Sequence, residues 1–459
     1  MVEAVQHFPA DFLWGTATAA HQVEGDNRYN DWWQWEQGGG GRIFRDQVSG
    51  RACEWWAGRA EEDIERMAAL NTRAHRLSIE WSRIEPAEGR WNTSALDRYR
   101  EILKAMRAAG IQPMVTLHHF TNPLWVAERG GWLHPDAPAW FRRYVQRVVG
   151  YLSDLVDTWC TINEPNVYAA RSYFQGLWPP GVSDMSQYFR VVYHLLEAHV
   201  AAYDVLHAEQ AQARVGLAKH MVRWMPRSSS ALDRWAARTL DNAFNGLTLN
   251  ALSMGRWQPL VGKKLELPRW RGTLDWIGLN YYFRYDAAFS LQALKQLGIT
   301  FGVRPDAQVL GPEGWGEIDY DGLFVLIKRL HRQFGLPIYI TENGVPDDKD
   351  RLRPAFILQS LQRVWKTVMH NIPVRGYFFW SLLDNFEWAE GYDPRFHFGL
   401  YAVDFETQAR ELRRSGELYG RIAGANAISS ELAREFAPEA LTDLYPGSSP
   451  GDVRALARD

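Results

Sequence analysis

The chain contains 459 residues, of which 46% are apolar and 23% are charged, and its formal net charge is −3. This near-neutral balance excludes the strongly basic surface expected of a nucleic-acid-binding protein. The two cysteines exclude both a disulfide framework and a cysteine-rich zinc site.

The start of the chain lacks targeting signals. The first residues, MVEAVQHFPADFLWG, contain no basic segment followed by an apolar run, which is the pattern of a secretory signal peptide. No stretch approaches 18 uncharged apolar residues, so no membrane-spanning helix is expected. We therefore expect a globular, cytoplasmic protein that binds neither membranes nor nucleic acid.

Short runs of β-branched and aromatic residues alternate with longer amphipathic stretches along the chain. The runs predict strands over residues 12–19, 75–81, 113–119, 158–163, 215–220, 276–282, 338–341 and 376–381. The amphipathic stretches predict helices over residues 59–70, 94–109, 137–155, 189–209, 322–334 and 353–370. Eight strands with intervening helices predict an α/β fold, a single (β/α)₈ TIM barrel spanning residues 1–440.

A doubly wound open sheet is the competing fold. It would be favoured by a glycine-rich phosphate loop after the first strand, and Gly15 alone does not make one. The four glycines at 38–41, flanked by tryptophans, indicate either an extended βα loop over the first strand or, equally, a flexible surface loop. We expect residues 441–459, which include PGSSPGD, to form a weakly ordered tail.

Two glutamates stand where an apolar strand gives way to a turn. Glu164 lies in TINEP and Glu342 in ITENG, 178 positions apart. Active-site groups of such barrels project from the C-terminal ends of the strands, so closure brings both carboxyls to one mouth. Glycoside hydrolysis uses two facing carboxyls: one protonates the leaving oxygen, and the other attacks the anomeric carbon or activates water.

At these residues the sequence resembles glycoside hydrolase family 1, the retaining β-glucosidase and β-galactosidase family. The resemblance covers roughly residues 8–428, and its motifs are TINEP, GLNYY, ITENG and WSLLDNFEW, in that order. It implies that Glu164 is the acid/base and Glu342 the nucleophile. Retaining chemistry predicts carboxyl groups about 5–5.5 Å apart.

The chemistry of the two glutamates sets their expected ionisation. A general acid must be protonated, so we expect burial and the second carboxylate to raise the pKa of Glu164. A nucleophile must be ionised, so Glu342 needs donors, for which Arg76 and Tyr282 are the candidates. The resemblance assigns Asn163 to the sugar 2-hydroxyl, and Asn280 is a further supporting residue at a strand end.

The resemblance also implies a sugar-binding pocket. It assigns Gln22, His119 and Glu387 to the sugar hydroxyls. Trp380 should form the stacking floor and Trp388 should add a ring N–H donor, while Trp315 could line the entrance. Of the adjacent His118 and His119, strand alternation lets only one point inward. A carboxylate at Glu387 would repel a sugar phosphate, which favours non-phosphorylated sugars.

These residues predict an exo-β-glycosidase acting on β-D-glucosides, with β-galactosides and β-fucosides as secondary substrates and transglycosylation as a side reaction. A catalytically silent sugar-binding protein on the same barrel is the alternative from another class, and both glutamates argue against it. An enzyme that mainly transfers sugars is a third possibility. The expected partner is a small β-glycoside or oligosaccharide. No metal or cofactor is implied, and the sequence predicts no oligomeric state.

Overall fold

The computed structural model describes residues 3–296, 298–307, 311–312 and 315–446. Eight parallel strands close into a barrel in the order β10-β13-β14-β2-β3-β4-β5-β6, and β6 pairs with β10 to complete the ring. The strands are β2 (Leu13–Ala17), β3 (Ala74–Ser78), β4 (Gln112–His118), β5 (Thr158–Asn163), β6 (Arg214–His220), β10 (Trp276–Asn280), β13 (Ile338–Asn343) and β14 (Val374–Trp380). The predicted (β/α)₈ barrel is confirmed, and each predicted strand corresponds to one of these.

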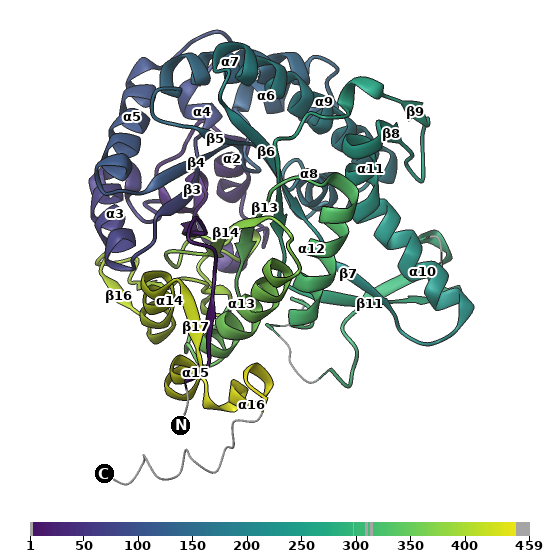
Figure 1. The fold of residues 1–459 in the computed structure, drawn as a ribbon. Coiled ribbons are helices and arrows are strands. Elements are labelled where there is room, and N and C mark those ends of the chain that lie inside the picture. Colours follow the sequence, from purple (N-terminus) through teal and green to yellow (C-terminus); the bar gives the residue numbers. More distant parts are fainter. Residues whose placement is uncertain (1–2, 297, 308–310, 313–314, 447–459) are drawn as a thin grey trace.

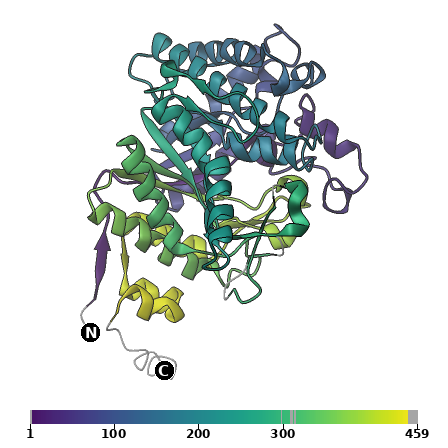
Figure 2. The same cartoon turned by 90° about the vertical axis from the view of Figure 1, so that its right-hand side faces the viewer.

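Helices surround the barrel (Figures 1 and 2). The six predicted helices are α3 (Ala60–Ala69), α5 (Thr93–Ala108), α7 (Ala137–Leu152), α9 (Met185–Glu209), α12 (Tyr320–Phe334) and α13 (Arg353–Met369). α9 begins four residues earlier than predicted because the Asp184 carboxylate caps it, accepting from the Ser186 amide at 2.7 Å. The barrel strands are buried on both faces, by side chains inside and helices outside, which explains their continuous apolar runs.

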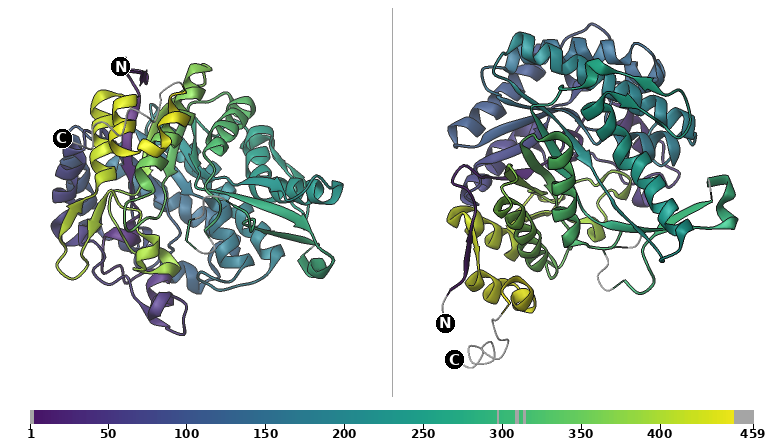
Figure 3. Two further views of the ribbon diagram at one scale, coloured as in Figure 1. Left: turned by 90° about the horizontal axis from the view of Figure 1, so that it is seen from below. Right: turned by 45° about the vertical axis from the view of Figure 1, so that its right-hand side comes forward.

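A small sheet outside the barrel was not predicted. It contains β12 (Ile299–Gly302), β11 (Arg284–Phe289) and β7 (Arg223–Pro226), and α10 (Ala231–Asp241) packs on it. It projects from the side of the barrel (Figures 1 and 3). Its strands are too short, and its burial too irregular, to show the period-two pattern that identifies a strand in a sequence.

The two ends of the described chain meet. β1 (Val5–His7) pairs antiparallel with β17 (Ala427–Ser429), and α15 (Ser430–Phe436) and α16 (Leu441–Leu444) follow. Leu441 and Leu444 are buried. The expected weakly ordered tail at 441–459 therefore does not hold for residues 441–446, and residues 447–459 lie outside the described residues.

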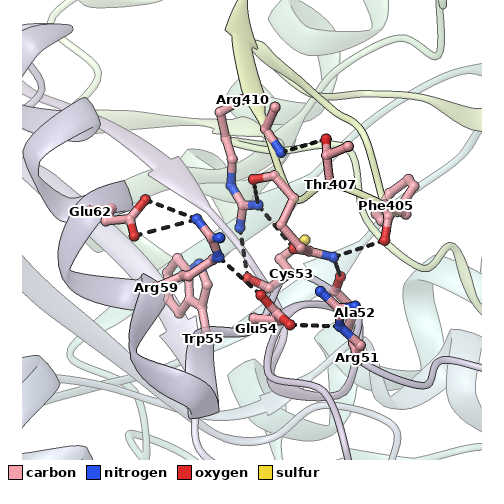
Figure 4. Close-up of polar contacts among 12 residues, drawn as sticks. Arg51, Ala52, Cys53, Glu54, Trp55, Arg59, Glu62, Phe405, Thr407 and Arg410 are labelled. Atoms are coloured by element: carbon pink, nitrogen blue, oxygen red, sulfur yellow. Dashed lines mark hydrogen bonds and ion pairs between the residues drawn. The ribbon is translucent and has the colours of Figure 1, made fainter.

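A polar network fastens the long loop after β2 to a C-terminal hairpin (Figure 4). The hairpin pairs β15 (Tyr401–Val403) with β16 (Arg410–Leu412). Arg410 donates to the carbonyl oxygen of Cys53 at 2.6 Å and forms an ion pair with Asp63 at 3.3 Å. Glu54 next to Cys53 accepts from Arg51 and Arg59. The network therefore fastens the end of this loop, just before α3, to the hairpin.

Within residues 3–446, apart from the short gaps given above, no helix is both long and apolar enough to cross a membrane.

Candidate active site

Barrel closure brings Glu164 and Glu342 to the same mouth. Glu164 directly follows β5, and Glu342 lies near the end of β13. Their side chains are almost completely buried, with 8% and 5% exposed. Two carboxyls that are distant in sequence thus occupy one secluded site, as predicted.

A chain of hydrogen bonds connects the two glutamates. Arg76 donates to Glu342 Oε1 at 2.5 Å and to Asn163 Oδ1 at 2.6 Å. Asn280 donates to that same Asn163 oxygen at 3.1 Å and to Glu164 Oε1 at 2.7 Å. These three side chains are among the four predicted to support catalysis. The fourth is Tyr282, whose hydroxyl donates to Glu342 Oε2 at 2.7 Å.

Three non-glycine residues of the site have left-handed backbone conformations. Glu164, Phe120 and Trp388 have φ angles of 44°, 71° and 49°. Such conformations are uncommon for side chains of this size and persist only where the surrounding structure holds them. The Glu164 amide, for example, donates to the carbonyl of Ala218 on β6 at 2.9 Å. The barrel therefore holds the site in place through its backbone.

The ionisation of the two glutamates is set by burial and by each other. Burial, followed by repulsion from Glu164, raises the pKa of Glu342 to about 7, although Arg76 and Tyr282 oppose the rise. Burial also acts to raise the pKa of Glu164, but His220 and Asn280 outweigh it and hold this pKa below its ordinary value. The charge of each carboxylate opposes the ionisation of the other, so the ionisation of each glutamate depends on that of its neighbour.

The order of the two pKa values is the reverse of the sequence-based expectation, which placed the raised pKa on Glu164. The reason is His220 at the end of β6, whose Nδ1 lies 3.4 Å from Glu164 Oε1. Sequence reasoning missed this residue because nothing in GLAKHMV indicates that the strand end aims its imidazole at the acid.

The predicted sugar-binding side chains gather beside the glutamates. Gln22 donates to Glu387 Oε2 at 3.1 Å and to the carbonyl of Phe386 at 2.9 Å. His119 contacts the Asn163 amide nitrogen through Nε2 at 3.1 Å. His118 instead contacts Asn122 at 3.1 Å, away from Asn163. Of the two histidines, His119 is therefore the one that joins the site.

Several polar atoms of this region are buried without a hydrogen-bond partner among the described residues. They are Gln22 Oε1, His119 Nδ1 and Trp315 Nε1. Buried polar groups are nearly always paired, and an unpaired one needs an explanation. A ligand rich in hydroxyl groups would supply the missing donors and acceptors.

Aromatic rings enclose the same space. Trp380 and Trp388 each lie nearly parallel to His119, with ring centroids 6.0 and 5.9 Å away. Phe120 contacts Trp388 at 5.1 Å. Trp315 packs against Tyr282 at 5.4 Å, which places it next to the residue that contacts Glu342. Flat apolar faces beside hydrogen-bonding groups suit a sugar ring.

A cavity of about 350 Å³ lies beside the sugar-binding residues. Loops after β2, β5 and β14 line it, and its apolar side chains include Phe44, Trp178 and Phe396. Trp178 contacts Trp388 at 5.8 Å and so joins this cavity to the sugar-binding residues. Phe398, in contrast, packs on Tyr282 and Trp315 nearer the glutamates.

The buried Arg76–Glu342 pair carries a prediction about stability. Replacing Arg76 by methionine leaves a buried carboxylate without its cation, which costs roughly 3–5 kcal/mol. Because Arg76 lowers the pKa of Glu342, the variant's Glu342 has a still higher pKa and binds a proton more tightly in the folded state. Stability then falls more steeply as pH rises. We expect urea denaturation to show a larger loss at pH 8 than at pH 5.

Arg28 provides the control for this prediction. Its ion pair with Asp26 is exposed, with 65% and 56% of the side chains accessible, so Arg28→Met should cost less than about 1 kcal/mol at either pH. If Arg76→Met lowers the free energy of unfolding by an equally small amount, or by an amount independent of pH, the role assigned to the buried pair is contradicted.

Comparisons with known proteins agree with this site. Residues 4–428 match the model of Glycosyl hydrolase family 1. The chain is 32% identical to Beta-glucosidase A of Thermotoga maritima over 92% of this chain and 99% of that protein. It is 30% identical to a beta-galactosidase of Pyrococcus woesei, over 94% and 99%.

Solved structures show the same relationship. A beta-glycosidase from Pyrococcus horikoshii superimposes with a TM-score of 0.87 at 38% identity, covering 94% of this chain and 98% of that one. A Thermotoga maritima beta-glucosidase in complex with deoxynojirimycin gives 0.85 at 32% identity, covering 92% and 100%.

The barrel and its pair of mouth glutamates define an enzyme that hydrolyses O-glycosyl bonds. The chain belongs to glycosyl hydrolase family 1, and it is a glycoside hydrolase of the β-glucosidase type.

Proposed function

We propose that this enzyme is a retaining exo-β-glycosidase that acts on terminal, non-phosphorylated β-D-glucosides by double displacement. The supporting observation is the hydrogen-bonded chain Glu342–Arg76–Asn163–Asn280–Glu164, which fixes two buried carboxyls around one space. The names of relatives, which include beta-glucosidases and a beta-galactosidase, support β-D-galactosides and β-D-fucosides as further substrates.

In the first step Glu342 attacks the anomeric carbon while Glu164 protonates the leaving oxygen. The C–O bond to the leaving group breaks as the bond to Glu342 forms, giving a glycosyl ester and a free alcohol. Arg76 and Tyr282 orient the attacking carboxylate through their hydrogen bonds. Asn163 stands between the glutamates, where it can donate to the sugar 2-hydroxyl.

In the second step Glu164, now ionised, takes a proton from water as that water attacks the anomeric carbon. The ester bond breaks, β-sugar leaves, and Glu342 returns as a carboxylate. An alcohol or a second sugar in place of water would give a transglycosylation product. The cavity lined by Phe44, Trp178 and Phe396 offers space for such acceptors and for leaving groups.

The stereochemistry of the first product tests this mechanism. Proton NMR during hydrolysis of p-nitrophenyl β-D-glucoside should show β-glucose first, with α-glucose appearing only as the sugar mutarotates. Initial release of α-glucose would indicate single-step inversion and would overturn the proposal.

Glu387 supports the preference for sugars without phosphate. Its carboxyl is buried next to Gln22, and burial raises its pKa well above the ordinary value. A phosphate dianion at carbon 6 would have to lose its water in this buried place, where the described side chains that hold Glu387 offer no cation, and it would repel the ionised form of the carboxyl. We expect kcat/KM for the 6-phosphoglucoside of p-nitrophenol to be at least about 100-fold lower than for the glucoside, the equivalent of about 3 kcal/mol.

A Glu387→Gln variant separates charge from shape in this comparison. It keeps the size of the side chain but cannot ionise. The difference in kcat/KM between the glucoside and the 6-phosphoglucoside should therefore become smaller. Equal use of both substrates by the unchanged enzyme would contradict the assignment of Glu387.

The catalytically silent sugar-binding protein is the second candidate, and no feature of the site favours it. Such a protein could bind p-nitrophenyl β-D-glucoside without releasing nitrophenol. Turnover therefore distinguishes the two.

A further inference from the structure

His220 ends β6 with its imidazole against the carboxyl of Glu164. Nδ1 lies 3.4 Å from Glu164 Oε1, and no other described residue forms a hydrogen bond with this nitrogen. The ring is nearly inaccessible, with 8% of the side chain exposed. This contact lies outside the Glu342–Arg76–Asn163–Asn280–Glu164 chain and reaches Glu164 from a different strand.

The imidazole is held on several sides. Tyr282 lies nearly parallel to it with ring centroids 5.9 Å apart, and Phe244 and Phe283 contact it at 5.9 and 5.7 Å. The backbone carbonyl oxygen of His220 accepts from the side chains of Asn166 and Lys219. A side chain fixed in this way cannot easily turn from Glu164, so the contact is built into the site.

Five charged or titratable groups besides His220 act on Glu164. Arg76 and Glu342 come from β3 and β13, Tyr282 and Glu387 follow β10 and β14, and Lys219 precedes His220 on β6. Lys219 points to the ring of Phe244 at 4.8 Å, and burial lowers its pKa well below the ordinary value. Arginine keeps its charge at every working pH, whereas imidazole gains and loses its charge within that range.

We propose that His220 is a positioning residue whose contact with Glu164 decides which of the two glutamates holds their shared proton. This rests on the proposed function. The contact with the imidazole favours the ionised form of Glu164, which leaves the proton on Glu342, an arrangement in which neither residue can perform its step. Where this contact is lost, the proton of the pair can reside on Glu164, and Glu342 becomes the carboxylate that attacks.

The proposal explains why the structure's order of pKa values is opposite to the order that catalysis needs. The largest effects that lower the pKa of Glu164 come from His220, and the resulting carboxylate repels Glu342 and raises its pKa. Removing the imidazole should reverse both shifts. The acidic limb of the pH–rate profile, which reports ionisation of Glu342, should therefore move to lower pH.

The test is the pH dependence of kcat/KM for p-nitrophenyl β-D-glucoside in wild type and His220→Asn. We expect the acidic limb of the variant to lie roughly one pH unit lower, the scale on which one neighbouring charge moves a carboxyl pKa. The alkaline limb should not move to lower pH. His207→Asn is the control, because His207 pairs with Asp275, which precedes β10 and so lies at the opposite end of the barrel from the glutamates, and its profile should match wild type. A His220→Asn profile of unchanged shape, lowered uniformly, would reduce His220 to a packing role and overturn the proposal.

A second measurement needs neither turnover nor a folded variant at position 220. In protein with ¹³C-labelled glutamate carboxyls and ¹⁵N-labelled imidazoles, NMR titration follows Glu164 and His220 in wild type and His220 alone in Glu164→Gln. The proposal predicts that the midpoint of His220 moves to lower pH in Glu164→Gln, because the carboxylate that stabilises the imidazolium is gone. An unmoved midpoint would overturn it. If the wild type hydrolyses no β-glycoside but the midpoint moves, the proposed function fails and the coupling stands.

Discussion

Replacing Glu342 by alanine is expected to lower kcat for p-nitrophenyl β-D-glucoside by at least about 10⁴-fold. Removing a residue that forms the covalent intermediate typically costs roughly 10⁴- to 10⁶-fold. Neither described side chain that bonds to Glu342 can replace it, because Arg76 and Tyr282 are donors that serve its carboxylate. Initial rates of nitrophenol release, measured over pH 5–9, test the expectation.

The product formed with azide makes this prediction specific. In Glu342→Ala the anion can enter the space left by the carboxylate and attack the anomeric carbon from that side. The product should then be α-glucosyl azide, with inverted configuration. Glu406→Ala, at an exposed turn, is the control and should retain wild-type turnover. Retention of more than a tenth of the activity by Glu342→Ala would exclude Glu342 as the nucleophile.

Replacing Glu164 by alanine should have an effect that depends on the leaving group. A general acid contributes roughly 10²- to 10⁴-fold when the leaving oxygen needs a proton. We therefore expect kcat/KM to fall by that factor for a methyl or cellobiose-type substrate. For 2,4-dinitrophenyl β-D-glucoside, whose leaving group is stable as an anion, kcat/KM should fall less than about tenfold.

Azide again tests the role directly. In Glu164→Ala the glycosyl ester on Glu342 forms but reacts slowly with water, because the general base is missing. Azide needs no base, so it should restore turnover and give β-glucosyl azide. An α-glucosyl azide, or a loss of kcat/KM that is equal for both leaving groups, would contradict an acid/base role for Glu164.

Much of this fold could be predicted because the barrel has a strong periodic pattern. Strands buried on both faces, such as β5 and β13, appear as short apolar runs between amphipathic helices. The small sheet of β7, β11 and β12 could not be predicted, since its residues lack such a pattern and its stability comes from packing against α10.

The site divides in the same way. Glu164 and Glu342 were identifiable because each stands in a distinctive motif at a strand end, and the barrel then brings them together. The ionisation of the two glutamates, in contrast, could not be predicted from the sequence. It depends on His220, which is 56 positions beyond Glu164 in the chain and reaches it only because β6 is the neighbour of β5 in the closed ring. A short-range pattern carries no information about such a contact.

Trapping the covalent intermediate tests the double-displacement mechanism most directly. With 2,4-dinitrophenyl 2-deoxy-2-fluoro-β-D-glucoside, the fluorine slows both steps by destabilising the positive charge of the transition state, and the good leaving group keeps the first step the faster. The protein should gain one fluoroglucosyl group, and mass spectrometry of its peptides should place that group on Glu342. An unlabelled protein that still hydrolyses β-glucosides, or a label on another residue, would contradict the mechanism.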